Sequence, residues 1–276
     1  MSDPRPIGVF DSGVGGLTVL HELLVSLPAE DFLYLGDTAR FPYGDKTPEQ
    51  LRAFALEIAE HLLAADAKLL VVACGSATAA ALPLLQERLV GTGVDAIGVI
   101  EPAARLAVEA TRSGRIGLLA TPATVVSRAY DEAIAADGRQ ARLTSVPCPD
   151  LAPIIQRGFP FDEQVVETVR RYTAPLREAD VDTVILGSTH YPLVAPRLQR
   201  MLGRGVRLVT SGQGVARSVE LALGERDLLS GRAGEGAYRF HTTGDVEAFR
   251  TLGTRFLQMP LGEVERVVLT PMEVPV

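Results

Sequence analysis

The sequence has no tryptophan and only two cysteines, Cys74 and Cys148, among its 276 residues. The two cysteines lie far apart and form no Cys-x-x-Cys pair, so neither a disulfide framework nor a zinc site is predicted. No ligand spacing in the chain implies a metal or another cofactor. Because sparse, unpaired cysteines are typical of proteins from a reducing compartment, we expect a cytoplasmic protein.

Long hydrophobic runs are also absent, since no apolar stretch reaches the roughly 18 residues that a membrane span needs. The N-terminal MSDPRPIGVF has neither the charged start nor the long apolar region of a signal peptide. Basic residues are fewer than acidic ones, and the formal net charge is −7. This negative charge argues against a general nucleic-acid binder. We therefore expect a small-molecule substrate and no membrane or nucleic-acid partner. An anionic substrate remains open, because a few backbone N–H groups can bind one locally.

Two common functional motifs are missing as well. No Gly-x-Ser-x-Gly elbow is present, so a serine hydrolase ranks low. The glycine-rich stretch DSGVGG at 11–16 is not Gly-x-Gly-x-x-Gly, and no P-loop lysine follows it, so a nucleotide site is only weakly supported.

What the sequence does contain is a regular alternation of short apolar runs and helix-length amphipathic segments. Apolar residues make up 47% of the chain and charged residues 22%, the balance of an ordinary globular protein. The alternation predicts mostly parallel sheets covered by helices on both faces. The predicted strands are 6–10, 31–36, 68–74, 96–100, 115–120, 141–148, 182–187 and 206–211. Clear helical patterns occupy 17–27, 47–65 and 162–179.

The chain also repeats itself. PIGVFDSG at 6–13 resembles RIGLLATP at 115–122, and VVAC at 71–74 resembles ILGS at 185–188. The simplest alternative is that any two strands of an α/β protein look alike. We predict two pseudo-symmetric, doubly wound α/β domains that enclose a cleft. The first comprises 1–100 and 211–276, with helical segments 212–224 and 244–258 packing back on it, and the second comprises 101–210.

Polar residues stand at the carboxyl ends of several predicted strands, which is where ligands bind in open α/β sheets. If the two halves face each other, these residues line one cleft. They are Asp11, Ser12, Cys74, Gly75, Ser76, Thr121, Ser188, Thr189 and His190.

Each of these motifs also has a plain structural interpretation. The glycines of DSGVGG would let the backbone wrap an anion at a helix N-terminus, or they form an ordinary turn capped by Ser12. In GDTARFPYG at 36–44, Tyr43 and exposed N–H groups could bind a carboxylate, or the segment is an ordered surface turn. Cys74 is either a buried structural residue or, before a helix N-terminus that would lower its pKa, a reactive thiol. A histidine beside Ser188 suggests acid–base chemistry or Ser–His activation, whereas His21, His61 and His241 lack such a setting.

Taken together and in order, DSGVGGLTVL, GDTARFPYG, VVAC-x-x-A-T-A, IG-x-x-A-T-x-A-T and LG-x-THYPL resemble the glutamate racemases of the aspartate/glutamate racemase superfamily. The resemblance covers about residues 6–225. It implies a cofactor-free isomerase that supplies D-glutamate for peptidoglycan. Two thiols, one from each half, flank the substrate α-carbon: one removes the α-proton and the other returns a proton to the opposite face.

Carried over residue by residue, the resemblance implies that Cys74 is one base and that position 188 is the other, assisted by His190. Asp11 and Ser12 would contact the amino group and the bound substrate. The turn Pro42, Tyr43 and Gly44 would hold the side-chain carboxylate of glutamate or a related dicarboxylic acid. The α-carboxylate would contact Gly75, Ser76, Thr121, Thr124 and Thr189.

Three positions depart from the family pattern. Ser188 replaces the second cysteine, Gly75 replaces an asparagine, and Gln156 replaces a glutamate that supports the histidine. A serine hydroxyl is far less acidic than a thiol, so we predict an impaired racemase. One alternative is a lyase like the arylmalonate decarboxylases, with Cys74 as sole proton donor and Gly75 leaving room for a bulkier substituent. A second is a catalytically silent glutamate-binding protein. The sequence leaves open whether the chain forms a homodimer.

Overall fold

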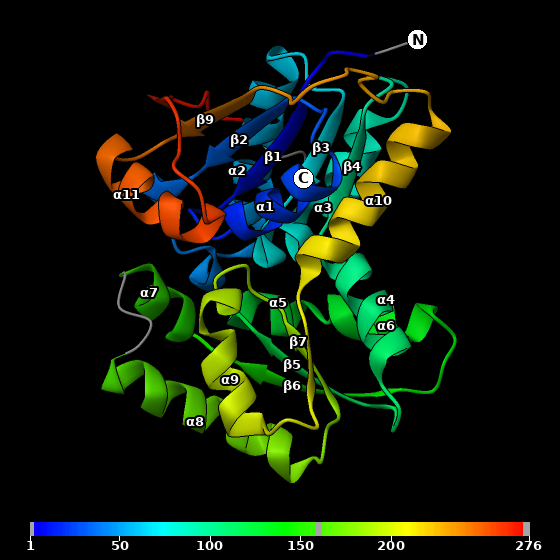
Figure 1. The fold of residues 1–276 in the computed structure, drawn as a ribbon, viewed down its shortest axis with the longest axis vertical. Coiled ribbons are helices and arrows are strands. Elements are labelled where there is room, and N and C mark those ends of the chain that lie inside the picture. The colour runs from blue at the N-terminus through cyan, green and yellow to red at the C-terminus, as the bar shows by residue number, and fades with distance from the viewer. Residues whose placement is uncertain (1–2, 158–161, 273–276) are drawn as a thin grey trace.

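Two parallel sheets, stacked end to end, form the framework of the protein (Figure 1). The computed structural model describes residues 3–157 and 162–272. A six-stranded sheet has the order β10-β9-β2-β1-β3-β4 and a four-stranded sheet the order β6-β5-β7-β8, and every pairing is parallel. We call the six-stranded sheet with its helices the first half, and the four-stranded sheet with its helices the second half. The predicted fold class is confirmed.

The strands agree with the predicted apolar runs at most positions. They are β1 (Ile7–Asp11), β2 (Phe32–Gly36), β3 (Leu69–Val72), β4 (Asp95–Gly98), β5 (Arg115–Ala120), β6 (Arg142–Pro147), β7 (Thr183–Leu186), β8 (Arg207–Val209), β9 (Tyr238–Thr242) and β10 (Val264–Arg266). The strand predicted over 96–100 ends at Gly98, because Ile100 already begins a helix. β9 and β10 were not predicted from the sequence.

The helices cover both sheets. They are α1 (Leu17–Ser26), α2 (Pro48–Ala64), α3 (Gly75–Leu89), α4 (Ile100–Ala110), α5 (Pro122–Ser127), α6 (Ala129–Ala136), α7 (Leu151–Gln156), α8 (Glu163–Glu178), α9 (Ala195–Leu202), α10 (Ser211–Glu225) and α11 (Val246–Leu257). Short 3₁₀ turns occupy Thr38–Arg40, Tyr43–Asp45 and Tyr191–Val194. Within the described residues, no helix is both long and apolar enough to cross a membrane.

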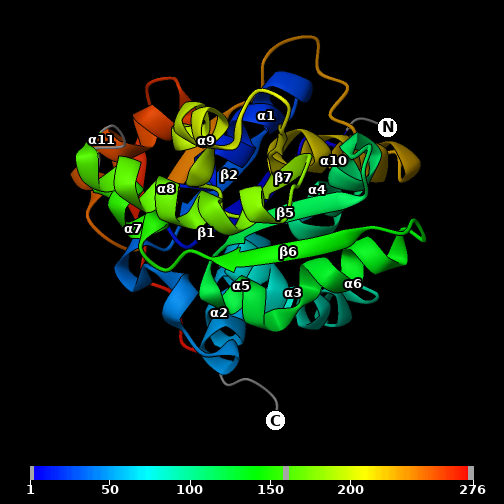
Figure 2. The ribbon, with the colours of Figure 1, turned by 90° about the horizontal axis from the view of Figure 1, so that it is seen from below.

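The repeat inferred from the sequence has a counterpart in the topology. The order β2-β1-β3-β4 within the first sheet matches the order β6-β5-β7-β8 of the second. The paired segments of the sequence repeat therefore occupy corresponding central strands, β1 with β5 and β3 with β7. Figure 2, seen from below, shows the second half in front with the first half behind it.

The C-terminal part of the chain packs back on the first half. α10 and α11 both pack on α1, while β9 extends the first sheet beside β2. The domain boundaries, 1–100 with 211–276 and 101–210, stay a prediction, and their outermost residues 1–2 and 273–276 lie outside the described part of the chain.

A buried ion pair ties the amino ends of the strands to the C-terminal part. Lys68 is fully buried, and its Nζ lies 2.6 Å from Glu30 Oε2 and donates to the carbonyls of Asp3 and Leu228, each at 2.7 Å. Glu30 Oε1 accepts from Ser230 N at 2.7 Å.

Lys68→Met is expected to destabilise the protein by about 3–5 kcal/mol, because it leaves the buried Glu30 carboxylate without its counter-charge. Urea unfolding measures the change. Arg88→Met serves as the control, since its pair with Glu60 is exposed and should contribute less than about 1 kcal/mol. If both variants lost the same small amount of unfolding free energy, the buried pair would not be needed for stability.

Candidate active site

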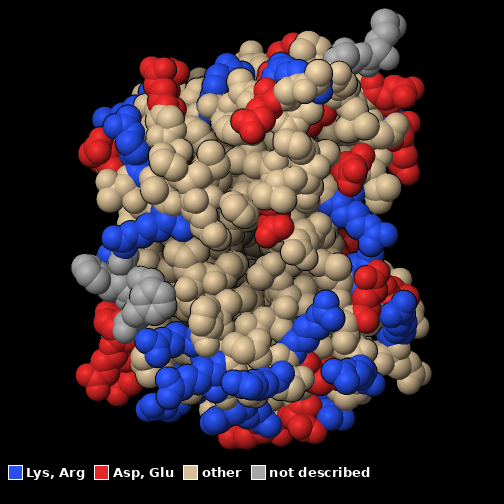
Figure 3. All heavy atoms as spheres, viewed as in Figure 1, with Lys and Arg blue, Asp and Glu red and all other residues tan. Residues whose placement is uncertain are grey.

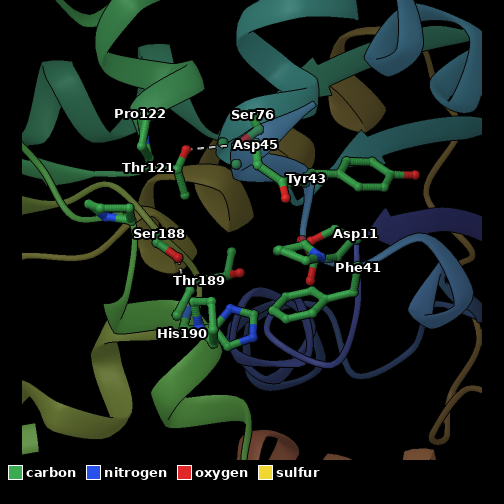
Figure 4. Close-up of a pocket in the computed structure, with 18 of the residues that line it drawn as sticks. Asp11, Phe41, Tyr43, Asp45, Ser76, Thr121, Pro122, Ser188, Thr189 and His190 are labelled. Atoms are coloured by element: carbon green, nitrogen blue, oxygen red, sulfur yellow. Dashed lines mark hydrogen bonds between the residues drawn. The ribbon is translucent and has the colours of Figure 1, made fainter. Parts of the chain in front are cut away.

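A cavity of about 430 Å³ lies between the halves at the carboxyl ends of β1, β3, β5 and β7 (Figure 4). The face shown in Figure 3 is hollowed between the two halves, and most atoms there belong to neither acidic nor basic residues. Every predicted site residue except Thr124 lines the cavity. These lining residues are Asp11, Ser12, Pro42, Tyr43, Gly44, Cys74, Gly75, Ser76, Thr121, Ser188, Thr189 and His190.

Cys74 and Ser188 occupy corresponding places in the two halves. β3 ends at Val72 and β7 ends at Leu186, so each of the two side chains follows its strand end by two residues. β3 pairs with β1 in the first sheet, and β7 pairs with the corresponding strand β5 in the second. The thiol and the hydroxyl thus reach one cavity from opposite sheets, as two groups acting on one carbon would need to.

The DSGVGG loop wraps the carboxylate of its own first residue. Asp11 Oδ2 accepts from Gly13 N at 3.2 Å and Gly16 N at 2.9 Å. A Cβ on Gly16 would lie 2.5 Å from Asp11 Cβ, and one on Gly15 would lie 2.4 Å from His190 Nδ1. The glycines are therefore required by close packing around Asp11 and against the second half. The N–H groups of Gly13 and Gly16 are thus used within the loop, and Ser12 does not cap α1, whose N-cap is Gly16.

Asp11 and Cys74 form a buried acidic pair. Burial raises the pKa of the Asp11 carboxyl to about 6. Burial, followed by repulsion from Asp11, raises the pKa of the Cys74 thiol to about 12. Hydrogen bonds from Ala77 N–H and Ser12 lower the pKa of Cys74 but do not outweigh these effects. The expectation that the N-terminus of α3 would leave this pKa depressed is wrong, because desolvation is the larger effect.

Asp11 Oδ1 is buried and makes no hydrogen bond of ordinary geometry with the described residues. The Cys74 thiol and the Ser12 N–H nevertheless lie near enough to lower the pKa of Asp11, although burial outweighs them. An unpaired carboxylate oxygen beside a thiol is unfavourable in isolation, whereas a bound cation would satisfy the oxygen and stabilise both anions. The Asp11–Cys74 side of the cavity is therefore suited to a ligand that carries a positive charge.

On the opposite side, none of the described lining residues around Ser188 is charged. His190 Nε2 lies 2.7 Å from Gln156 Oε1, so with this acceptor the proton is on Nε2. The ring lies between Phe41, at 5.5 Å, and Phe256, at 5.2 Å between centroids. Burial lowers the pKa of His190 to about 3, so the imidazole is neutral at physiological pH.

Hydroxyl groups from both halves meet at the top of the cavity. Ser76 Oγ lies 2.8 Å from Thr121 Oγ1 (Figure 4). Thr121 Oγ1 in turn lies 3.0 Å from Thr124 Oγ1. Thr124 therefore does not line the cavity itself but hydrogen-bonds to Thr121, which does. Below, Thr18 Oγ1 donates to the carbonyl of Thr189 at 3.0 Å and forms a second link between the halves.

Gly75 lines the cavity. A Cβ at this position would lie 2.8 Å from the Gly187 carbonyl oxygen, so a side chain here would require a shift of the second half. The room for a bulkier substituent, on which the malonate decarboxylase alternative depends, stays a prediction.

The Tyr43 hydroxyl does not face the cavity. Figure 4 shows the ring directed away, and its hydroxyl donates to Asp37 Oδ2. Its backbone and that of Gly44 form the wall, where a Cβ on Gly44 would lie 3.0 Å from Thr121 Cβ. A phenol contact to a substrate carboxylate is therefore not available in this arrangement.

An apolar part of the lining was not predicted from the sequence. It comprises Phe41, Pro122, Pro149, Ala152 and Pro153. They lie in turns and at helix starts, where a single sequence offers no periodic signal. Asp45 also lines the cavity and is largely exposed. Among the described residues, no group of three or more His, Cys, Asp or Glu is arranged to hold a metal ion.

The fold and the site define an α/β protein in which two similar halves enclose one cavity. A model of the Asp/Glu/Hydantoin racemase family matches residues 11–219. Glutamate racemase from Beutenbergia cavernae is 45% identical over 284 aligned positions, covering 100% of this chain and 97% of the relative. The chain therefore belongs to the glutamate racemases, cofactor-independent amino-acid racemases within that family.

Solved structures agree with this assignment. A glutamate racemase isoform from Bacillus anthracis superimposes with a TM-score of 0.91 at 36% identity, covering 96% of this chain and 97% of that one. Glutamate racemase from Francisella tularensis, solved in complex with D-glutamate, gives a TM-score of 0.88 at 33% identity, with 96% and 98% covered.

Proposed function

We propose that the chain binds glutamate in this cavity and interconverts its enantiomers by removal and return of the α-proton. The observation that carries the proposal is the placement of Cys74 and Ser188, two residues beyond corresponding strand ends, around one cavity. The Francisella tularensis relative, solved with D-glutamate, supports the choice of substrate.

The charges of the first half-site suit an amino acid. Asp11 would accept the α-ammonium through its buried Oδ1, and Ser12 lies beside it in the lining. The ammonium charge would lower the raised pKa of the Cys74 thiol, because it stabilises the thiolate and offsets the repulsion from Asp11. Substrate binding would thereby help to produce the base that the reaction needs.

The hydroxyl cluster of Ser76, Thr121 and Thr124 would hold the α-carboxylate, together with Thr189. The backbone N–H groups of Tyr43 and Gly44 would hold the side-chain carboxylate. The two carboxylate sites would adjoin each other, since a Cβ on Gly44 would lie 3.0 Å from Thr121 Cβ. These contacts fix the α-carbon between positions 74 and 188.

Efficient racemisation needs an acid–base group on each face of that carbon, and the second half-site is weak. Ser188 stands where the resemblance implies a thiol, and a hydroxyl is poorly matched in pKa to proton transfer near neutrality. Gln156 cannot supply the negative charge that would stabilise a protonated His190. We propose that the chain therefore racemises glutamate slowly as it stands.

Glutamate is expected to bind in the presence of a chelator, with the affinity lowered by Ser12→Ala. Isothermal calorimetry with each enantiomer measures both affinities. Ser113→Ala, in the turn before β5 and away from the cavity, is the matched control and should bind as the unmodified chain does. No binding of either enantiomer at millimolar concentration would rule out glutamate as the substrate.

A further inference from the structure

Asp37, which follows β2, is a fully buried carboxylate with three side-chain partners. Its Oδ2 accepts from Arg40 Nε at 2.6 Å and from the Tyr43 hydroxyl. Its Oδ1 accepts from Thr243 Oγ1 at 2.7 Å. Its backbone N donates to the Asp11 carbonyl at 2.9 Å, which joins it to the strand that carries Asp11.

Arg40 extends this cluster toward α2. Its Nη1 pairs with Glu57 Oε2, and its guanidinium lies 4.0 Å from the centroid of the Phe54 ring. Phe54 in turn lies 5.5 Å from the Tyr43 ring, between centroids. Glu57 Oε1 accepts from Met272 N at 3.3 Å. The loop from Asp37 to Asp45 is thus held from behind by charged and aromatic contacts.

The end of β9 completes the cluster from about 200 residues further along the chain. Thr243 Oγ1 also accepts from Ala39 N at 3.1 Å, and Thr38 Oγ1 lies 2.7 Å from Thr242 Oγ1. Removing the Thr243 hydroxyl would leave Asp37 Oδ1 buried without its partner, which is costly.

Among the described residues, this cluster reaches the cavity through the Phe41–Asp45 segment and through the hydrogen bond from Asp37 N to the carbonyl of Asp11. The Tyr43 phenol anchors that turn at the rear, while the backbone forms the wall of the cavity. Backbone N–H groups bind a carboxylate well only when they point at it, and a shift of about 1 Å can cost roughly 10²-fold in a reaction rate. The position of the turn therefore controls what the wall can bind.

We infer that Asp37 and Thr243 are positioning residues, which hold the Pro42–Asp45 turn through Tyr43 and so set the affinity for the substrate's side-chain carboxylate. The inference rests on the proposed function for the identity of that carboxylate. It assigns a role in substrate selection to the C-terminal part of the chain, whose residues up to 272 contribute nothing to the lining of the cavity.

Thr243→Val tests the inference, because it keeps the shape of the side chain and removes only the hydroxyl. Thr243→Ser, which keeps the hydroxyl, and Thr254→Val on α11, whose hydroxyl bonds only to its own helix, are the controls. Amide hydrogen exchange of the ligand-free variants reports on residues 38–46. Calorimetry compares glutamate with 2-aminopentanoate, which has no side-chain carboxylate.

Thr243→Val is expected to speed exchange in residues 38–46 but not in α10. It should also weaken glutamate binding at least about tenfold and 2-aminopentanoate binding less than about twofold. Both controls should match the unmodified chain. Unchanged exchange, or equal weakening of the two ligands, would overturn the inference. If the unmodified chain binds no glutamate, the proposed function fails, and the exchange result alone decides whether the turn is held as described.

Discussion

Ser188→Cys is expected to raise the rate of glutamate racemisation by roughly 10²–10⁴-fold, the usual contribution of a positioned acid or base. The change places a thiol at the position in the second half that corresponds to Cys74 in the first. A thiol titrates near pH 8.5 in water, so it can give or take a proton near neutrality, whereas a serine hydroxyl cannot without strong activation. Ser188 is buried and lines the cavity, so the new thiol needs no rearrangement to reach the substrate.

Polarimetry or chiral chromatography, started from each enantiomer in turn, measures this gain. Ser188→Ala is the matched control and should change the rate only a few-fold, because the hydroxyl contributes little. If Ser188→Ala abolished racemisation and Ser188→Cys failed to increase it, then the serine itself would be the second acid–base group.

With Cys74 as the one competent base, the unmodified chain is expected to exchange the α-hydrogen of one glutamate enantiomer faster than it racemises that enantiomer. The thiolate takes the α-proton, and the electron pair delocalises into the α-carboxylate. The resulting thiol exchanges with solvent and returns hydrogen to the same face. The configuration is then retained, since inversion needs a donor on the Ser188 side.

Cys74→Ser should remove this exchange in the present chain and the racemisation in the Ser188→Cys variant. Proton NMR of the α-hydrogen in D₂O measures exchange. Exchange that survives Cys74→Ser would mean that another group, such as Asp11, is the base.

The sequence was sufficient to predict the inner strands of both sheets and the polar ends that converge on the cavity. Buried parallel strands appear as short apolar runs, and a turn that follows such a run must lie at the carboxyl edge. β9 and β10 were missed because they lie at the outer side of the first sheet, where buried residues are interrupted by partly or fully exposed ones. Tyr238–Thr242 is an example. β9 pairs with β2, about 200 residues earlier in the chain, and β10 pairs with β9, so no local pattern marks either strand.

The orientation of side chains was the part that the sequence could not supply. Tyr43 was expected to face a ligand, but its hydroxyl donates to Asp37, and nothing in GDTARFPYG indicates which side of the turn is buried. The effect of the helix N-terminus on Cys74 was overestimated, because the depth of burial is a tertiary property. The pairing of Asp37 with Thr243 likewise joins segments about 200 residues apart.

The most direct test of the account is the ratio of α-deuterium exchange to racemisation in D₂O, measured for each glutamate enantiomer with the unmodified chain. The account predicts that one enantiomer gains α-deuterium several times faster than it inverts, that the other exchanges slowly, and that Ser188→Cys brings the two ratios close to one. Racemisation by the unmodified chain at rates of ordinary enzymes, about 1–10³ s⁻¹, with exchange and inversion equal from both sides, would contradict the claim that Cys74 acts alone.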